Sequence, residues 1–195
     1  MNIVLASGSP RRKELLMKFI KDFKVQLSDI EEDMTTYNDV NSLVMKLAFE
    51  KGADVLNRCE DDEIIISADT IVVYDNEVLG KPKSEEEAKS MLEKLSNNYH
   101  KVITGICIMK KEGNIKILDY ETTRVKMKKL DKNEIEEYIK TGEPMDKAGA
   151  YGIQGLGSIF VESIEGDYYN VMGLPLNKLY SYLLKYFDIS LLNTK

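Results

Sequence analysis

The sequence alternates between two hydrophobic periodicities, and this alternation limits the possible folds more than any other feature. Short β-branched or alternating runs, typical of strands, stand between longer segments whose apolar residues recur at helical spacing. The expected strands are 3–6, 23–27, 64–66 with 71–73, 78–79, 102–109 and 115–127, and the expected helices are 10–20, 40–56, 84–95, 130–139 and 174–187. Strands that alternate with helices, together with a long hairpin, predict an α/β fold with a mixed sheet and flanking helices.

Composition and charge exclude several classes of protein. The 195 residues include 27 lysines and arginines and 33 aspartates and glutamates, and the resulting net charge of −6 argues against nucleic acid as the main partner. The apolar fraction of 43% is that of a folded chain, and the length suits a single domain over residues 1–195. No apolar segment approaches the roughly 20 residues that span a bilayer, and the first residues lack the pattern of a signal peptide. No association with a membrane is therefore expected.

The cysteines and the histidine set further limits. Cys59 and Cys107 are the only cysteines, and their spacing fits neither a redox pair nor a zinc site, which favours a reduced, cytoplasmic setting. His100 is the only histidine, so neither a histidine-rich metal site nor a His-based triad with spare partners can be built. Because His100 stands at the expected start of a strand, we interpret it as a structural residue.

A basic segment between the first strand and the first helix predicts a phosphate site. Residues 7–9 (Ser-Gly-Ser) end the strand, Pro10 suits the first helical position, and Arg11, Arg12 and Lys13 follow. The free N–H groups at a helix start attract anions, whereas cations there oppose the helix dipole by about 0.3–1 kcal/mol each. A polyphosphate ligand would reverse that penalty. A solvated basic helix start is the alternative.

Asp69 belongs to the segment 67–70, which separates the β-branched runs 64–66 and 71–73. A buried carboxylate needs a cation, hydrogen-bond donors or a proton. The position therefore indicates ligation of Mg²⁺ or activation of a water molecule. The alternative is an edge position or a bend at which Asp69 is solvated.

Three other segments are candidates with simpler alternatives. The acidic residues 29–33 suit a hard cation, although such charge runs are usually solvated. Lys81 precedes Pro82, which restricts Lys81 to extended geometry and can aim its ammonium group; an ordinary surface lysine is the alternative. In the glycine-rich stretch 149–157, the amide of Gln154 matches the N3–H donor and O4 acceptor of uracil or thymine. A loop glutamine without a ligand is the alternative there.

The ordered set of motifs resembles the Maf family of nucleoside triphosphate pyrophosphatases, also described as septum-formation inhibitors, over nearly the whole chain. It consists of 5–12 (LASGSPRR), 68–72 (ADTIV), 80–82 (GKP), 100–105 (HKVITG), 142–144 (GEP), 146–155 (DKAGAYGIQG) and 166–176 (GDYYNVMGLPL). The resemblance implies an inosine-triphosphate-pyrophosphatase-like fold, elongated and two-lobed with a central cleft. It also implies a homodimer.

The resemblance implies an activity and assigns residues to it. Members of the family cleave nucleoside triphosphates to the monophosphate and pyrophosphate with a divalent metal, here Mg²⁺ with Mn²⁺ as the alternative. Asp69 matches the proton acceptor, and Glu32 with Asp69 would hold the metal. The positions that match substrate-binding residues are Ser7, Arg11, Arg12, Lys51, Thr70, Lys81 and Gln154. Among them, Arg12, Thr70 and Gln154 match positions linked to substrate choice, and the sequences of 150–155 and 169–175 are similar to the branch that acts on dTTP and UTP.

Several positions depart from the pattern of the family. Ser67 stands where many members have Gly, and Gly52 stands where Ala is common after the lysine. The pair 97–98 (Asn-Asn) replaces a Gly-basic pair. Glu31 replaces an Asp, which leaves open whether Glu31 or Glu32 faces the metal.

The sequence leaves two other functions open. One is the same chemistry on another, modified base. The other is a nucleotide-binding regulator of septum formation that needs no turnover. For the pyrophosphatase itself, the implied physiological roles are removal of modified nucleotides and arrest of cell division.

Overall fold

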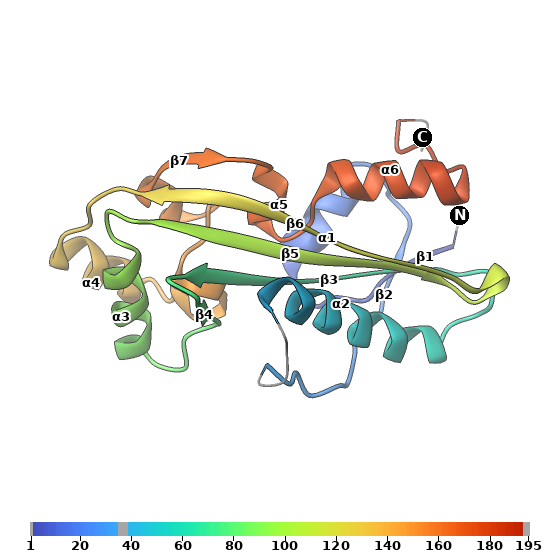
Figure 1. Cartoon of the computed structure of the whole chain (residues 1–195), viewed down its shortest axis with the longest axis horizontal. Coiled ribbons are helices and arrows are strands. Elements are labelled where there is room, and N and C mark those ends of the chain that lie inside the picture. The colour runs from blue at the N-terminus through green and yellow to red at the C-terminus, as the bar shows by residue number, and fades with distance from the viewer. Residues whose placement is uncertain (1, 35–38, 193–195) are drawn as a thin grey trace. The chain divides into compact units, whose positions relative to one another are not determined.

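The computed structural model describes residues 2–34 and 39–192 (Figure 1). Seven strands within these ranges form one mixed sheet in the order β2-β1-β3-β5-β6-β7, with β4 paired to β3. They are β1 (Ile3–Leu5), β2 (Lys24–Val25), β3 (Ile64–Tyr74), β4 (Glu77–Leu79), β5 (Tyr99–Lys110), β6 (Ile115–Met127) and β7 (Val161–Glu165). β1 is parallel to β2 and to β3, whereas β4 and β7 run antiparallel to β3 and to β6. The mixed sheet and its helices confirm the predicted α/β fold class.

Helices accompany the sheet along the chain. They are α1 (Pro10–Met17), α2 (Val40–Asn57), α3 (Glu85–Leu95), α4 (Lys132–Lys140), α5 (Tyr168–Met172) and α6 (Leu176–Phe187), with 3₁₀ turns η1 (Glu112–Asn114), η2 (Glu143–Asp146), η3 (Ala148–Ala150) and η4 (Leu156–Phe160). In the part of the sheet nearest the termini, α2 lies on one face and α6 on the other (Figure 1). None of the helices in the described ranges is both long and apolar enough to cross a membrane.

The chain divides into two compact units. The first consists of the described residues of Met1–Asp69, Thr104–Glu121 and Gly173–Lys195, and the second of Thr70–Ile103 and Thr122–Met172. Each unit has an apolar core of its own. The first core includes Val4, Ala48, Val55, Ile65 and Cys107, and the second includes Val72, Leu92, Val125, Tyr138 and Phe160. The strands β3, β5 and β6 each contribute residues to both units.

β3 is a single strand of 11 residues that runs without interruption through Asp69. Asp69 itself is buried, with 8% of its surface exposed. The alternative that Asp69 occupies a solvated bend is therefore wrong. The β-branched runs on both sides pair with neighbouring strands, and this pairing keeps the intervening residues extended as well.

Turns and caps define most element boundaries. The turn between β3 and β4 is made by Asp75 and Asn76, whose φ angles of 48° and 62° are those of a tight hairpin turn. Ser84 accepts a hydrogen bond from the Glu87 N–H at 3.2 Å and so caps α3. The Glu87 carboxylate accepts the Lys83 N–H at 2.7 Å, so Ser84 and Glu87 do not form a complete capping box.

Some elements differ from the sequence prediction. α1 ends at Met17, three residues before the predicted end, and β2 is only two residues long. α4 begins at Lys132, because Asp131 and Glu134 form a complete capping box there. Two short elements, β7 and α5, were not predicted at all.

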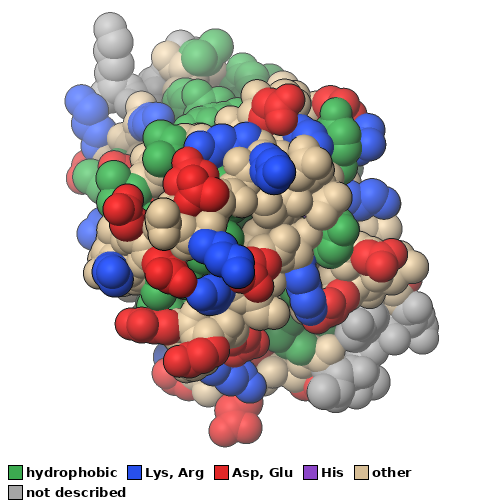
Figure 2. Space-filling model, turned by 90° about the vertical axis from the view of Figure 1, so that its left-hand side faces the viewer, with side chains coloured by type: hydrophobic (Ala, Val, Ile, Leu, Met, Phe, Trp, Pro, Cys, Tyr) green, Lys and Arg blue, Asp and Glu red, His purple; other side chains and the backbone are tan. Residues whose placement is uncertain are grey.

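Charges of both signs share the surface. On the face drawn in Figure 2, the side chains of Lys and Arg are interspersed with those of Asp and Glu, and apolar side chains lie between them. On this face neither sign of charge is segregated from the other.

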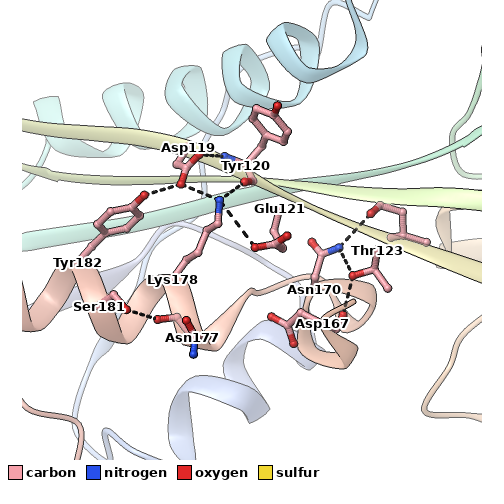
Figure 3. Close-up of polar contacts among 11 residues, drawn as sticks. Asp119, Tyr120, Glu121, Thr123, Asp167, Asn170, Asn177, Lys178, Ser181 and Tyr182 are labelled. Carbon is pink, nitrogen blue, oxygen red and sulfur yellow. Dashed lines mark hydrogen bonds and ion pairs between the residues drawn. The ribbon is translucent and has the colours of Figure 1, made fainter. Parts of the chain in front are cut away.

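Within the first unit, α6 is attached to β6 by a polar network (Figure 3). The Lys178 ammonium donates to Asp119 Oδ2 at 2.8 Å and to the Tyr120 carbonyl, and lies 3.7 Å from Glu121 Oε2. The Tyr182 hydroxyl donates to Asp119 as well. Burial favours the neutral form of Asp119, but the hydrogen bonds from Lys178 and Tyr182 outweigh it and lower the pKa of this carboxyl.

Candidate active site around Asp69

The centre of the candidate site is Lys51, a residue of α2 that contacts two carboxylates. Its ammonium donates to Asp69 Oδ1 at 2.5 Å and lies 2.7 Å from Glu32 Oε1. Only 15% of the Lys51 side chain and 11% of the Asp69 side chain are exposed. The buried carboxylate in the middle of β3 therefore has the cation that its burial requires.

The acidic run before α2 contributes one residue to this site. Glu32 is the member that contacts Lys51, whereas Asp33 lies 3.2 Å from Lys46. Glu31 is exposed to solvent. Across residues 2–34 and 39–192, no group of three or more His, Cys, Asp or Glu side chains is arranged to hold a metal ion. A metal here would therefore need ligands from a substrate in addition to Asp69 and Glu32.

The packing of α2 against β3 places Lys51 next to Asp69. Ser67 is fully buried in β3, and its hydroxyl donates to the Ala48 carbonyl of α2 at 2.7 Å. A Cβ atom on Gly52 would lie 2.5 Å from this Ser67 hydroxyl, well inside a normal contact distance. The absence of a side chain at Gly52 thus allows the helix and the strand to approach each other beside the Lys51–Asp69 pair.

Arg12 is the buried member of the basic segment, with 9% of its surface exposed. Its Nε donates to the Gly173 carbonyl at 2.7 Å, and its Nη1 donates to Ser7 Oγ at 3.1 Å. Ser7 Oγ also accepts the Ser9 N–H at 3.3 Å. These bonds fix the guanidinium at the point where β1 gives way to α1.

The electrostatic environment links Arg12 to the Lys51 site. Burial is the main factor and lowers the pKa of Arg12. The negative charges of Asp69 and Glu32 oppose this shift, whereas the positive charge of Arg11 adds to it. The charges of Arg11, Asp69 and Glu32 therefore all act on Arg12 within the first unit.

Three of the predicted site residues belong to the second unit. Thr70 follows Asp69 in β3 and is half-buried. Lys81 is exposed in the loop after β4, and Gln154 is exposed in a turn of the glycine-rich segment. The first unit contains the remaining candidates, namely Ser7, Arg11, Arg12, Glu32, Lys51 and Asp69.

The sequence reasoning missed two groups of residues near these candidates. One is the Gly173 carbonyl, which Arg12 binds from a distance of 161 positions along the chain. The other is the pair Glu143 and Tyr138, which contacts the loop that carries Gln154. The segments that contain Gly173 and Glu143 were both part of the motif set, but the motifs gave no indication of what either residue contacts.

Comparisons with known proteins agree with the motif set. The Maf-like protein family matches residues 2–186. A dTTP/UTP pyrophosphatase of Clostridium perfringens strain SM101 is 51% identical over 193 residues, which cover 98% of this chain and 100% of that protein. A dTTP/UTP pyrophosphatase of Alkaliphilus metalliredigens strain QYMF is 50% identical over 190 residues, which cover 97% of this chain and 98% of that protein.

A solved structure extends the comparison to the fold. The HAM1 protein from Coxiella burnetii superposes with a TM-score of 0.52 at 15% sequence identity, and the match covers 95% of this chain and 99% of that one. At this identity the likeness shows a shared fold. The family match over residues 2–186, together with relatives about 50% identical over nearly their whole length, shows that the chain belongs to the Maf-like protein family.

Proposed function

We propose that this chain is a nucleoside triphosphate pyrophosphatase that hydrolyses dTTP and UTP to the monophosphate and pyrophosphate. The names of the relatives that are 51% and 50% identical support this activity and this choice of base. The observation that carries the mechanism is the single ammonium group of Lys51 between the carboxylates of Asp69 and Glu32. We further propose that residues 1–195, with both compact units, act as one catalytic domain.

The donor set at this position suits a hard divalent cation. Asp69 and Glu32 offer only oxygen atoms, and their two carboxylates already accommodate one positive charge, that of Lys51. Mg²⁺ is typically bound by one or two carboxylates together with substrate phosphates. We therefore assign Asp69 and Glu32 as the residues that hold Mg²⁺, with Mn²⁺ as the alternative. Such an ion, when bound, neutralises phosphate charge and lowers the pKa of water.

In the proposed reaction, a water molecule attacks the α-phosphorus of the triphosphate. Its proton passes to an Oδ atom of Asp69, the bridging P–O bond breaks, and pyrophosphate leaves. Lys51 holds the Asp69 carboxylate in place, because its ammonium donates to Oδ1 at 2.5 Å.

The basic residues are proposed to neutralise the triphosphate. Arg12 is already oriented by its bonds to Gly173 and Ser7, so little reorganisation accompanies substrate binding. Arg11, Lys51 and Lys81 are proposed to add positive charge where the transition state needs it, which is the main task in phosphoryl transfer. Ser7 is proposed to line the phosphate site, and Arg12, Thr70 and Gln154 are proposed to select the substrate.

The oligomeric state, the compartment and the partners of the protein are also proposed. We propose a homodimer in the cytoplasm that uses neither nucleic acid nor a membrane as a partner. The net charge of −6 supports the first exclusion, and the two buried free thiols, Cys59 and Cys107, suit a reduced compartment. Light scattering of the purified protein tests the dimer.

The test of the mechanism is Asp69→Asn. We expect kcat for dTTP to fall at least 10²–10⁴-fold, because the proton acceptor is lost, while dTTP binding persists. Pyrophosphate release and calorimetric binding measure the two effects. Asp54→Asn is the matched control, since Asp54 lies on α2, pairs with Arg58 just beyond the end of this helix, and forms no ion pair with Lys51. Full turnover by Asp69→Asn would contradict the proposed mechanism.

The same assay separates the other functions. The assay is repeated with a panel of nucleotides, with and without Mg²⁺. A nucleotide that is hydrolysed faster than dTTP and UTP would show that the enzyme prefers another base. Binding of dTTP with no pyrophosphate release in any condition would favour a regulator that needs no turnover.

A further inference from the structure

The loop that carries Gln154 is bound to one half-buried carboxylate, that of Glu143. Glu143 Oε2 accepts the Leu156 N–H at 2.8 Å, and Glu143 Oε1 accepts the Gly157 N–H at 3.2 Å. The Tyr138 hydroxyl donates to Glu143 Oε1 at 2.9 Å and accepts the Gly152 N–H at 3.3 Å. Residues on both sides of Gln154 are thus bound to the same acid–phenol pair, and all of them belong to the second unit.

The glycines of this loop are explained by the same pair. A Cβ atom on Gly155 would lie 2.5 Å from Glu143 Cδ, and a Cβ atom on Gly157 would lie 2.6 Å from the Tyr138 hydroxyl oxygen. Both distances are shorter than any normal contact. The loop backbone therefore packs directly on the carboxylate and the phenol, and glycine at these positions permits that close approach.

A fixed backbone matters because of the chemistry of a glutamine side chain. A 180° rotation of the terminal amide exchanges its oxygen with its NH₂ group. In one orientation Gln154 would complement the N3–H and O4 of thymine or uracil, and in the other it would complement the N3 and N4–H₂ of cytosine. Because this rotation is about a side-chain bond, Gln154 can distinguish the two bases only if the loop holds its side chain at a fixed distance and angle from the base, where the surroundings favour one orientation of the amide.

We propose that Glu143 is the positioning residue for base selection, because it binds the backbone on the C-terminal side of Gln154 and, through Tyr138, the backbone on the N-terminal side. This inference rests on the proposed function. In this proposal Glu143 does not contact the substrate. It acts by limiting the motion of the loop, and its effect should be confined to the recognition of the base.

Glu143→Gln is the most informative variant, because it keeps the shape of the side chain. A carboxylate presents two acceptor oxygens to Leu156 and Gly157, whereas an amide presents one oxygen and one NH₂ donor. Whichever way the amide turns, one of the two loop N–H groups faces a donor and loses its bond. The matched control is Glu136→Gln, which removes an exposed carboxylate that pairs with Lys89 on α3.

The experiment measures kcat and KM for dTTP and dCTP by pyrophosphate release. For Glu143→Gln we expect the ratio of kcat/KM for dTTP over dCTP to fall about tenfold, mainly through KM for dTTP, with kcat within about threefold of wild type. Glu136→Gln should keep the wild-type ratio. An unchanged ratio in a Glu143→Gln protein that melts like wild type would overturn the inference.

Amide hydrogen exchange supplies a readout that does not depend on activity. We expect the N–H groups of Leu156 and Gly157 to exchange at least tenfold faster in Glu143→Gln than in Glu136→Gln, and equal rates would overturn the inference. If Glu143→Gln does not fold, Tyr138→Phe takes its place, with a smaller loss of selectivity in the same direction, and an unchanged ratio there overturns the inference too. If the wild type hydrolyses no nucleotide, the proposed function fails by itself, and the ratio of dTTP to dCTP dissociation constants then decides the inference.

Discussion

At the scale of single residues, the packing of α2 against β3 depends equally on the absent side chain of Gly52 and on the hydroxyl of Ser67. The hydroxyl occupies the volume that a Cβ atom on Gly52 would need, since the two would lie 2.5 Å apart. Both residues depart from the pattern of the resembled family, and the structure shows that the departures compensate each other. The Ser67 hydroxyl fills the space that the missing Cβ atom of Gly52 leaves.

This compensation predicts strong coupling between the two positions. Gly52→Ala alone should destabilise the protein by about 1–3 kcal/mol, because the new methyl group overlaps the Ser67 hydroxyl. Ser67→Gly alone should cost about 1 kcal/mol for the lost hydrogen bond to Ala48. The double variant should lie within about 1 kcal/mol of wild type, because the methyl group then replaces the hydroxyl. Urea unfolding measures all four proteins, and strictly additive losses would contradict the interpretation.

His100 predicts a pH dependence of stability. The imidazole is buried, shares a 2.7 Å hydrogen bond with the Tyr151 hydroxyl, and has a pKa lowered to about 4 by burial. The unfolded chain, with a histidine pKa of about 6.5, therefore takes up the proton first as the pH falls. The contribution of His100 is present above pH 6.5 and is lost between pH 6.5 and pH 4.

The loss should amount to about 2 kcal/mol between pH 7 and pH 5. Urea unfolding of wild type and His100→Gln at both pH values measures it. Carboxylates contribute equally to both proteins, so the difference between them isolates His100. A pH dependence that is identical in the two proteins would contradict a buried, neutral imidazole.

At the scale of elements, the attachment of α6 to β6 depends on Lys178 (Figure 3). Lys178→Met should destabilise the protein by about 1–3 kcal/mol, because Asp119 is then left partly buried without its cation. Lys185→Met, on the last turn of the same helix, should cost less than about 0.5 kcal/mol. Thermal or urea unfolding of both variants measures the difference. Equal losses in the two variants would show that the network does not hold the helix.

The length of an element decides whether its sequence predicts it. The long strand β3 and the helix α2 were predictable, because many residues in each repeat one periodicity. β7 and α5 have five residues each, too few for a periodicity, and β7 is defined by its antiparallel pairing with β6.

The backbone angles of loops also lack a periodic pattern from which they could be predicted. Asn97 has a φ angle of 58°, in the left-handed region that Asn tolerates better than most residues. This explains how Asn replaces the Gly of the family pattern, although the sequence by itself does not specify the angle.

For the candidate site, the chemical role of a residue was easier to predict than the residues that it contacts. The candidate roles of Asp69 and Arg12 followed from their residue types and their places in the motif set. The bond from Arg12 to Gly173 depends on the full path of the chain between them, which no local pattern contains. The choice of Glu32 over Glu31 as the neighbour of Lys51 depends in the same way on the shape of the loop before α2.

At the scale of the whole molecule, three strands contribute to both compact units. β3, β5 and β6 each cross the boundary between the units, at Asp69–Thr70, Ile103–Thr104 and Glu121–Thr122. Unfolding of one unit would remove part of each of these strands. We therefore expect the protein to unfold in one cooperative transition, although it has two cores.

Two probes test this cooperativity. Cys59 and Cys107 belong to the first core, and burial raises the pKa of Cys59 and raises that of Cys107 to about 12, so both thiols should resist alkylation in the native state. His100 belongs to the second unit and supplies the only imidazole signal in an NMR spectrum. The urea midpoints of thiol labelling and of the His100 signal should coincide. Thiols that become reactive while the native His100 signal persists would contradict a single transition.

The fit between Gly52 and Ser67 also has a historical consequence. A lineage that moves from the pair common in the resembled family, Ala at position 52 and Gly at position 67, to the pair found here must change one position first. If serine appears at position 67 while alanine is still at position 52, the serine hydroxyl overlaps the alanine methyl group. If glycine replaces alanine at position 52 first, only a small gap is left. The order of the two substitutions is therefore set by steric exclusion. A reconstructed ancestor of this branch should contain glycine at both positions.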